Sequence, residues 1–344
     1  MPTAVALSPA RNRREPVVLA LGPCGLPNAR LAAAAGRAGA VGVLDLGRRG
    51  PAARRALELA SWWTRTAGAD KSGGFGVRAG AGCQIAPEEL EVLAPGRVDV
   101  VVLGAGSPWW PDDPRLAAYR VIGEVTSLDE ARIAADAGVH GLIARGSECG
   151  GAVGELSSFV LLQQLVAADL GLPVWAAGGI GEHTAAAAVI GGAVGVVLDT
   201  QLALMPEAEL PEPVAAVLRG MDGSETQLVG DLRVLRPRGV SADALEGPDA
   251  IDPATLPPVG QDGFLAARFR DRYGDTASAI RAVTGAIVDA VREDPAADLL
   301  GEGAPLAASL GTRIPVAQGP MTRVSDQAAF AAAVAEDEIG RAHV

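Results

Sequence analysis

Aromatic residues, cysteines and positive charge are all scarce in this sequence, and each shortage excludes a class of protein. Aromatic residues make up 3% of the 344 residues, whereas apolar residues make up 49%. A core built mainly from alanine, valine and leucine suits helices packed closely on a sheet better than an aromatic-rich sandwich. The net charge of −12 argues against affinity for nucleic acid or for anionic membranes.

Cysteines and long apolar runs are also few. The three cysteines, Cys24, Cys83 and Cys149, are odd in number and form no Cys-x-x-Cys pair, which favours a reducing compartment and argues against a metal site. The longest uncharged run, Thr184–Leu198, is shorter than the ~20 residues that span a bilayer. The early apolar stretch Val17–Leu21 is too short for a signal peptide and is interpreted as a first strand. We therefore expect a cytoplasmic protein.

Short apolar segments alternate with helix-length segments between residues 16 and 204. Several of the apolar segments are rich in β-branched residues and nearly continuous in apolar character, as strands buried on both faces are. The eight predicted strands are Pro16–Leu21, Val41–Leu46, Gly74–Arg78, Val98–Leu103, Arg120–Val125, Gly141–Arg145, Pro173–Ala177 and Gly195–Asp199. Strict alternation predicts a parallel sheet, and eight repeats favour a closed (β/α)8 TIM barrel over an open doubly wound sheet, which stays the alternative.

The segments between the strands have helical signatures. The predicted helices are Pro27–Ala38, Pro51–Thr64, Ser127–Ala137, Glu155–Asp169 and Glu182–Ile190. Ser127 and Glu130 have the spacing of a capping box at the start of one of them. The connection around Ser107–Pro114 is short and Pro-rich, so its helix is expected to be stunted.

The alternation ends after Leu204, and four further segments are predicted around the barrel of residues 16–204. Residues 1–15 are expected to form a disordered tail. Residues 205–304 are expected to form an α+β extension and linker, with a hairpin at Gln227–Leu235 and a helix at Thr276–Glu293 whose apolar face comprises Ile280, Val283, Ile287 and Val291. Residues 305–337 have the pattern of a first βα unit of a second, truncated barrel. The last seven residues, EIGRAHV (338–344), equal one reading frame of a common sequencing-adapter oligonucleotide, so we expect them to be an artefact and the natural chain to continue.

Glycines at the end of the seventh predicted strand predict a phosphate site. In VWAAGGIGEHT, Gly178–Gly179 stand between a strand and the start of a helix. Backbone N–H groups without side chains can approach a phosphate closely, and the helix N-terminus adds positive potential. The next strand ends at Asp199–Thr200, and the loops after strands seven and eight are the recurrent phosphate site of TIM barrels. A purely structural turn is the alternative.

The end of the sixth strand carries a family resemblance. The string RGSECGGAVGE resembles the nitronate monooxygenase / 2-nitropropane dioxygenase family, whose sixth strand ends in a Gly-x-Glu-Ala-Gly-Gly-His-x-Gly loop. Ala176–Ile180 and Gly192–Thr200 resemble the family's FMN-phosphate strands. The resemblance implies an FMN cofactor and the oxidation of alkyl nitronates or a related flavin reaction. It implies cofactor contacts from Gly22, Gly150, Gly151, Ala177, Gly178, Gly179, Asp199 and Thr200.

Two departures from the family pattern bear on activity. The family's catalytic base, a His, is replaced by Ala152, which cannot accept a proton. The family's Gly-Thr after strand eight is Asp199–Thr200 here, and a carboxylate beside a phosphate opposes binding unless it points away. The sequence therefore leaves two functions open: a divergent FMN-dependent oxidoreductase, and a catalytically silent barrel that serves as a structural or docking module.

A second resemblance concerns partners. Ile314–Glu336 is similar to the family's first strand and helix, with Pro315, Gly319, Pro320 and Met321 in the pattern of the turn under the flavin. This predicts an internal repeat. Tandem barrels of this kind resemble modules at the front of polyketide- and fatty-acid-synthase-type proteins. The partners implied are a small-molecule or acyl-thioester substrate and other domains of a longer polypeptide.

A few other side chains are candidates for chemistry. Glu148 either holds backbone N–H groups of its loop or acts as an acid/base, and Glu124 is the nearest alternative base. Trp109–Trp110 either stack on a ligand or cap the barrel. Cys149 is expected to be a small buried filler, and His183 a solvated first-turn residue.

Overall fold

The computed structural model describes residues 17–66, 74–236, 257–292, 299, 301–318, 328–336 and 340–341, so the predicted tail over residues 1–15 lies outside the described residues. The chain divides into two compact units, residues 1–287 and 288–344. Among the described residues of the second unit are α11 (Pro305–Leu310), α12 (Ala328–Glu336), and the strands β12 (Ala317–Gln318) and β13 (Gly340–Arg341), which pair in parallel. The first unit contains the site and is described below.

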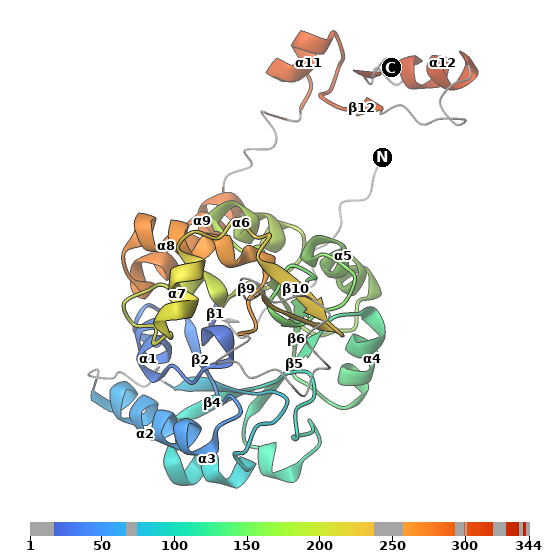
Figure 1. Cartoon of the computed structure of the whole chain (residues 1–344). Coiled ribbons are helices and arrows are strands. Elements are labelled where there is room, and N and C mark those ends of the chain that lie inside the picture. Colours follow the sequence, from blue (N-terminus) through green and yellow to red (C-terminus); the bar gives the residue numbers. More distant parts are fainter. Residues whose placement is uncertain are drawn as a thin grey trace. The chain divides into compact units, whose positions relative to one another are not determined.

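The first unit is built on a closed barrel of eight parallel strands (Figure 1). They are β1 (Val18–Leu21), β2 (Val41–Asp45), β3 (Phe75–Ala79), β4 (Val98–Leu103), β5 (Arg120–Val125), β6 (Leu142–Arg145), β8 (Val174–Ala177) and β9 (Gly195–Leu198). β1 pairs with β2 on one side and with β9 on the other, which closes the ring. The predicted (β/α)8 barrel is confirmed, with each predicted strand in place, and the open sheet is excluded.

Helices surround this ring. They are α1 (Ala29–Arg37), α2 (Gly50–Thr66), α3 (Pro87–Leu93), α4 (Leu128–Asp136), α5 (Ser158–Ala168) and α6 (Glu182–Ile190). The connection after β4 contains only the short 3-10 helix η2 (Pro114–Leu116), as its proline content predicts. Helix α3 was not predicted, because seven residues are too few to show a helical period.

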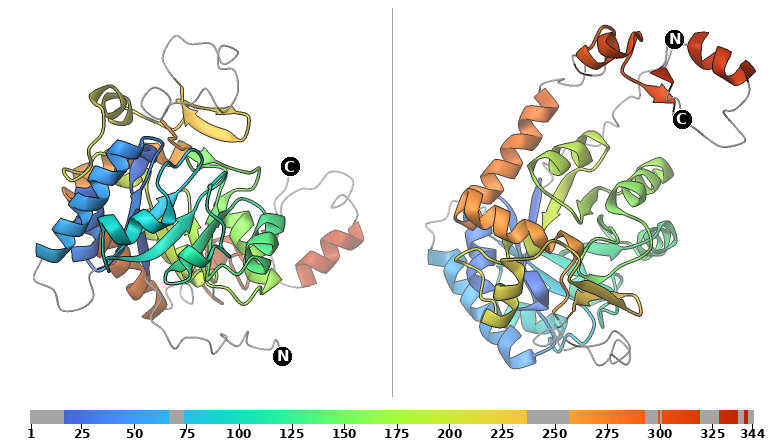
Figure 2. Two further views of the ribbon diagram at one scale, coloured as in Figure 1. Left: turned by 90° about the horizontal axis from the view of Figure 1, so that it is seen from below. Right: turned by 45° about the horizontal axis from the view of Figure 1, so that its top comes forward.

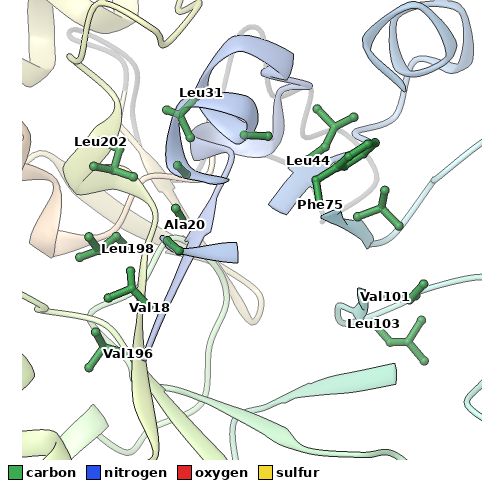
Figure 3. Packing of buried hydrophobic residues seen from close by; sticks show 14 of the residues in the cluster. Val18, Ala20, Leu31, Leu44, Phe75, Val101, Leu103, Val196, Leu198 and Leu202 are labelled. Atoms are coloured by element: carbon green, nitrogen blue, oxygen red, sulfur yellow. The ribbon is translucent and has the colours of Figure 1, made fainter. Parts of the chain in front are cut away.

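Side chains alternate between the two sides of each strand. On β1, Val18 and Ala20 face the helices and join the large cluster of buried side chains that includes Leu31 of α1 (Figure 3). Leu19 and Leu21 point the other way, into a second cluster inside the barrel. The same alternation runs through the other strands, so the barrel is a packed core rather than a pore.

The extension after residue 204 covers one end of the barrel (Figure 2). Strands β10 (Thr226–Val229) and β11 (Leu232–Leu235) form the predicted hairpin, and β11 pairs with β7 (Gly151–Ala152) from the loop that follows β6. The 3-10 helix η3 (Thr200–Leu202) precedes the extension, which also contains α7 (Glu212–Leu218), η6 (Gln261–Phe264), α8 (Leu265–Tyr273) and α9 (Thr276–Arg292).

The predicted apolar face of helix α9 is buried at three of its four positions. Ile280, Val283 and Ile287 are buried, whereas Val291 is 59% exposed. Val291 lies beyond Ile287, where the first compact unit ends. No described helix has both the length and the apolar character that crossing a bilayer requires.

Candidate active site at the barrel mouth

Five charged side chains form one layer at the carboxyl end of the barrel. Along a strand every second side chain points into the barrel. Each member of the layer follows, by two residues, a position of its strand that points into the barrel interior, so it also points inward. Its members are Asp45, Arg78, Glu124, Arg145 and Asp199. Three carboxylates therefore share the barrel mouth with two guanidinium groups, and active sites of TIM barrels lie at this end.

Arg78 is the centre of an ion-pair network in this layer. Its guanidinium donates to Oε1 and Oε2 of Glu124 over 2.8 and 2.7 Å and to Asp45 over 3.0 Å, while Arg145 donates to Oε1 of Glu124 over 3.4 Å. Burial alone would raise the pKa of Glu124, but the charges of Arg145 and Arg78 outweigh it and lower that pKa to about 2. Glu124, predicted as the nearest alternative base, is therefore a weak proton acceptor.

The Gly178–Gly179 turn lies between β8 and α6, as predicted. Both residues have positive φ angles, 105° and 64°, and a side chain on Gly178 would lie 2.6 Å from the hydroxyl of Ser158. The turn therefore requires glycine. The N–H of Gly179 does not face open space, because it donates to the carboxylate of Asp262 over 3.0 Å.

The second predicted phosphate donor is engaged in the same way. The N–H of Thr200 donates to the carboxylate of its neighbour Asp199 over 2.6 Å. Asp199 is 7% exposed, and burial raises its pKa although the charge of Arg145 opposes the shift. Two of the predicted phosphate-binding N–H groups, those of Gly179 and Thr200, thus donate to carboxylates of the chain itself.

Asp262 comes from η6 in the extension and is 2% exposed. Besides the N–H of Gly179, the side-chain amide of Gln201 donates to its Oδ2 over 3.4 Å, while Oδ1 has no hydrogen-bond partner among the described residues. Burial, and then the negative charge of Asp199, raise the pKa of Asp262 well above its usual value. Two carboxylates are thus buried close to one another where the sequence predicts a phosphate.

Glu148 and Cys149 have structural environments in the loop after β6. The carboxylate of Glu148 accepts from the N–H of Ser158 over 3.2 Å and lies 2.6 Å from its hydroxyl, so it fixes the start of α5. Cys149 is fully buried, and burial raises the pKa of its thiol well above 9.0. The structure therefore favours the structural alternative for Glu148 and the filler role for Cys149.

A cavity opens at the mouth beside the charged layer. Its empty space is about 850 Å³, with the open solvent at its entrance included. Four predicted cofactor residues line it, namely Gly22, Gly150, Gly151 and Asp199, together with Ala152. The other four, Ala177, Gly178, Gly179 and Thr200, are not part of its wall. The structure thus brings half of the predicted site together and leaves the phosphate turn outside the cavity.

The aromatic and histidine candidates lie away from the cavity. Trp109 is buried in the cluster between the strands and the helices, and its indole N–H donates to the carbonyl of Ile85 over 3.0 Å. Trp110 is 69% exposed, and His183 is exposed on α6. None of the three lines the cavity.

Sequence analysis missed Arg78, Arg145 and Asp262. A signal for the two arginines was present, since each is a charged residue that ends an otherwise apolar strand at an inward-facing position. Asp262 has no local signal, because its place beside Gly179 depends on a contact between residues 83 positions apart.

A flavin with a phosphate fits only part of this site. The cavity is where the ring system of a flavin would lie, and this part of the site is called the ring end. It is lined mainly by glycine, alanine and other small or apolar residues beside Arg78 and Arg145. At the phosphate end, the N–H donors are satisfied internally and two buried carboxylates occupy the space. The phosphate end as it stands does not fit a phosphate dianion.

The fold and the site define a (β/α)8 barrel with a ligand cavity at its carboxyl end. The sequence profile of the family described as nitronate monooxygenase matches residues 74–300. The chain therefore belongs to the nitronate monooxygenase family.

Individual relatives cover part of the chain. A nitronate monooxygenase of Paraburkholderia phytofirmans is 30% identical over 202 residues, 54% of this chain and 54% of that protein. A (3aS,4S,5R,7aS)-5-hydroxy-7a-methyl-1-oxo-octahydro-1H-indene-4-carboxyl-CoA dehydrogenase of Mycobacterium tuberculosis is 30% identical over 207 residues, 57% of this chain and 55% of that protein. The chain spans about half the length of these curated relatives.

Solved structures with the same fold cover more of the chain. FabK from Thermotoga maritima has a TM-score of 0.63 at 25% identity, over 81% of this chain and 94% of FabK. A nitroalkane oxidase from Streptomyces ansochromogenes has a TM-score of 0.56 at 19% identity, over 80% of this chain and 96% of that one.

Proposed function

We propose that this barrel is a flavin-dependent oxidoreductase whose reaction does not include proton abstraction from carbon. Family membership supports the flavin class, and the cavity at the barrel mouth carries the proposal, because it collects Gly22, Gly150 and Gly151 around a space open to solvent. The replacement of the family's His by Ala152 in the cavity wall sets the limit on the chemistry.

Two positions support this limit, Ala152 in the cavity wall and Glu124 in the charged layer. Ala152 carries no proton acceptor, and Glu124 is held as a carboxylate by two arginines. Neutral nitroalkanes must lose a C–H proton before oxidation, so they require a base. A nitronate is already the conjugate base of a nitroalkane and needs no such step. Arg78 and Arg145 line the cavity that an anion of this kind would enter.

The proposed substrates are therefore preformed alkyl nitronates rather than neutral nitroalkanes. The test is to measure turnover of both by the full chain supplied with flavin. We expect nitronate oxidation above the rate of free flavin, and nitroalkane oxidation no faster than free flavin. Nitroalkane turnover equal to that of the nitronate contradicts the proposal.

Two substitutions sharpen this test. Ala152→His restores a base at the family position and is expected to raise nitroalkane turnover at least tenfold, with a smaller effect on nitronate turnover. Ala105→His is the matched control, because Ala105 lines the same cavity from the loop after β4. An equal gain in both variants shows that any imidazole in the cavity suffices and contradicts the role assigned to position 152.

A catalytically silent barrel is the second candidate, and the internal carboxylates at Gly179 and Thr200 favour it. In that case the barrel is a structural or docking module for other domains of a longer, polyketide-synthase-like polypeptide in a reducing, cytoplasmic compartment. Full-length protein that takes up no flavin and turns over neither a nitronate nor an enoyl thioester supports this candidate. Flavin uptake with turnover of either substrate excludes it.

A further inference from the structure

The phosphate end of the site already contains acceptors for two of its N–H donors. The N–H of Gly179 donates to Oδ2 of Asp262, and the N–H of Thr200 donates to Oδ1 of Asp199. A flavin phosphate bound at these two turns would need the same N–H groups, because they are the donors that the ends of β8 and β9 present. Ligand and chain therefore compete for them.

Asp262 is held in place by close packing of the segment that carries it. Residues 257–262 lie directly on the loop after β6: a side chain on Gly150 would come within 2.3 Å of the carbonyl oxygen of Pro258. A side chain on Gly260 would come within 2.2 Å of the carbonyl oxygen of Glu148. The segment therefore packs closely on the loop after β6, and this packing holds Asp262 beside Gly179.

The charges of Asp199 and Asp262 also oppose the binding of a phosphate. Asp199 and Asp262 are both buried, and Oδ1 of Asp262 lacks a partner among the described residues. Arg78 is paired with Asp45 and Glu124, whereas Arg145 contacts Glu124 over 3.4 Å and the carbonyl of Gly150. A phosphate dianion would therefore face two carboxylates, and the guanidinium of Arg145, whose buried Nε has no partner among the described residues, is the one counter-charge in the layer that is not fully paired.

The cavity itself stops short of this end. Its wall contains Gly22, Gly150, Gly151 and Asp199, but neither Gly178, Gly179 nor Thr200. This cavity therefore reaches Asp199 but not the Gly178–Gly179 turn.

We propose that Asp262 and Asp199 occupy the phosphate subsite of this barrel, so that its cavity takes a flavin without a phosphate, of the riboflavin type. This inference rests on the proposed flavin function. It reverses the preference for a phosphorylated cofactor that the glycine turns alone imply.

The test compares riboflavin with FMN on the full chain, with Kd values from quenching of flavin fluorescence. We expect wild-type protein to bind riboflavin at least as tightly as FMN. In the double variant Asp199→Gly/Asp262→Ser, which frees both N–H groups and removes both charges, we expect the Kd of FMN to fall at least tenfold and that of riboflavin to change less than twofold. Asp136→Asn, at the exposed end of α4, is the matched control and is expected to change neither.

Each outcome bears on the inference. Wild-type protein that binds FMN tenfold more tightly than riboflavin overturns it, and so does a double variant with an unchanged ratio of the two Kd values. Wild-type protein that binds neither flavin refutes the proposed function alone. The double variant then decides the inference: uptake of FMN supports it, and no uptake overturns it.

Asp262→Asn replaces the double variant if circular dichroism shows that the latter is unfolded. Its side-chain oxygen still accepts from Gly179 but carries no charge, so a threefold or larger fall in the Kd of FMN is expected. No change in that Kd overturns the charge argument.

Discussion

Substitution of Glu124 by glutamine tests whether the charged layer stabilises the barrel as a balanced unit. The side chain of Glu124 is 2% exposed. Both of its carboxylate oxygens accept hydrogen bonds from Arg78, and Arg145 lies 3.4 Å away. Removing its charge leaves two buried guanidinium groups with one fewer counter-charge. Loss of one partner of a buried ion pair typically lowers the free energy of unfolding by about 3–5 kcal/mol, and we expect a loss of about 3 kcal/mol because glutamine retains one acceptor.

The measurement is urea denaturation of the full chain followed by far-UV circular dichroism. Glu212→Gln is the matched control, since Glu212 pairs with Arg219 on the surface with side-chain exposures of 73% and 56%. Exposed pairs of this kind contribute about 0–1 kcal/mol. A Glu124→Gln variant that loses no more stability than the Glu212→Gln control refutes the reasoning.

The pH dependence of the same difference gives a second check. The pKa of Glu124 is lowered to about 2 in the folded chain, below the value of about 4.3 for an unfolded glutamate. Its stabilising contribution is therefore fully present above the unfolded pKa and is lost as the pH falls through the folded pKa. The difference between wild type and Glu124→Gln should be constant near neutral pH and should shrink below about pH 4. A difference that stays constant down to pH 2 contradicts the ion-pair origin.

Three further predictions follow from the site. Asp262→Asn should stabilise the chain increasingly as the pH rises. The pKa of Asp262 is raised on folding, so the wild-type chain loses stability as the pH rises through that pKa, and the asparagine variant does not. Thermal melts in which the variant changes the melting temperature equally at pH 4 and pH 8 contradict this prediction. Gly178→Ala should lower the free energy of unfolding by about 2–5 kcal/mol, because alanine is strained at a positive φ and its side chain would also contact Ser158. Gly171→Ala is the control: Gly171 has a φ of 70° but open space around it, so this variant should lose only the strain energy of about 1–3 kcal/mol. Equal losses in the two variants exclude a contribution from packing. The three cysteines are buried, and burial raises the pKa of each thiol, to about 12 for Cys24. A thiol reagent at pH 8 should therefore label the native protein slowly and the unfolded protein at three sites. Fast labelling of the native protein contradicts the burial.

Local patterns were sufficient to predict the barrel. Each strand is a short apolar run followed by a helix start, so β4 and β5 were predicted at their observed bounds and the helix α6 likewise. The hairpin of β10 and β11 was also predicted, since its alternation is visible over a few residues. Periodicity carries this information because strand and helix contacts repeat along the chain.

The site was predicted less completely, for physical reasons that differ between residues. Gly178 and Gly179 were found because positive φ angles restrict their positions to glycine. Arg78 and Arg145 could have been found from the inward parity of their strands. The contact of Asp262 with Gly179 joins two distant elements, and no local propensity encodes a contact of that range.

The three-stranded sheet at the mouth has a consequence for how fast ligands can exchange. β7 belongs to the loop after β6, while β10 and β11 belong to the hairpin, and Leu232 and Val234 of that hairpin form part of the cavity wall. The N–H of Val153 donates to the carbonyl of Asp231, and the guanidinium of Arg233 donates to the carbonyl of Ser147, so the two segments are fastened on both sides of the pairing. Because of these contacts, the loop after β6 and the hairpin should open together as one cooperative unit. The rate at which the amides of this unit exchange with solvent deuterium should set the upper limit on the rate at which a ligand enters the cavity past the hairpin.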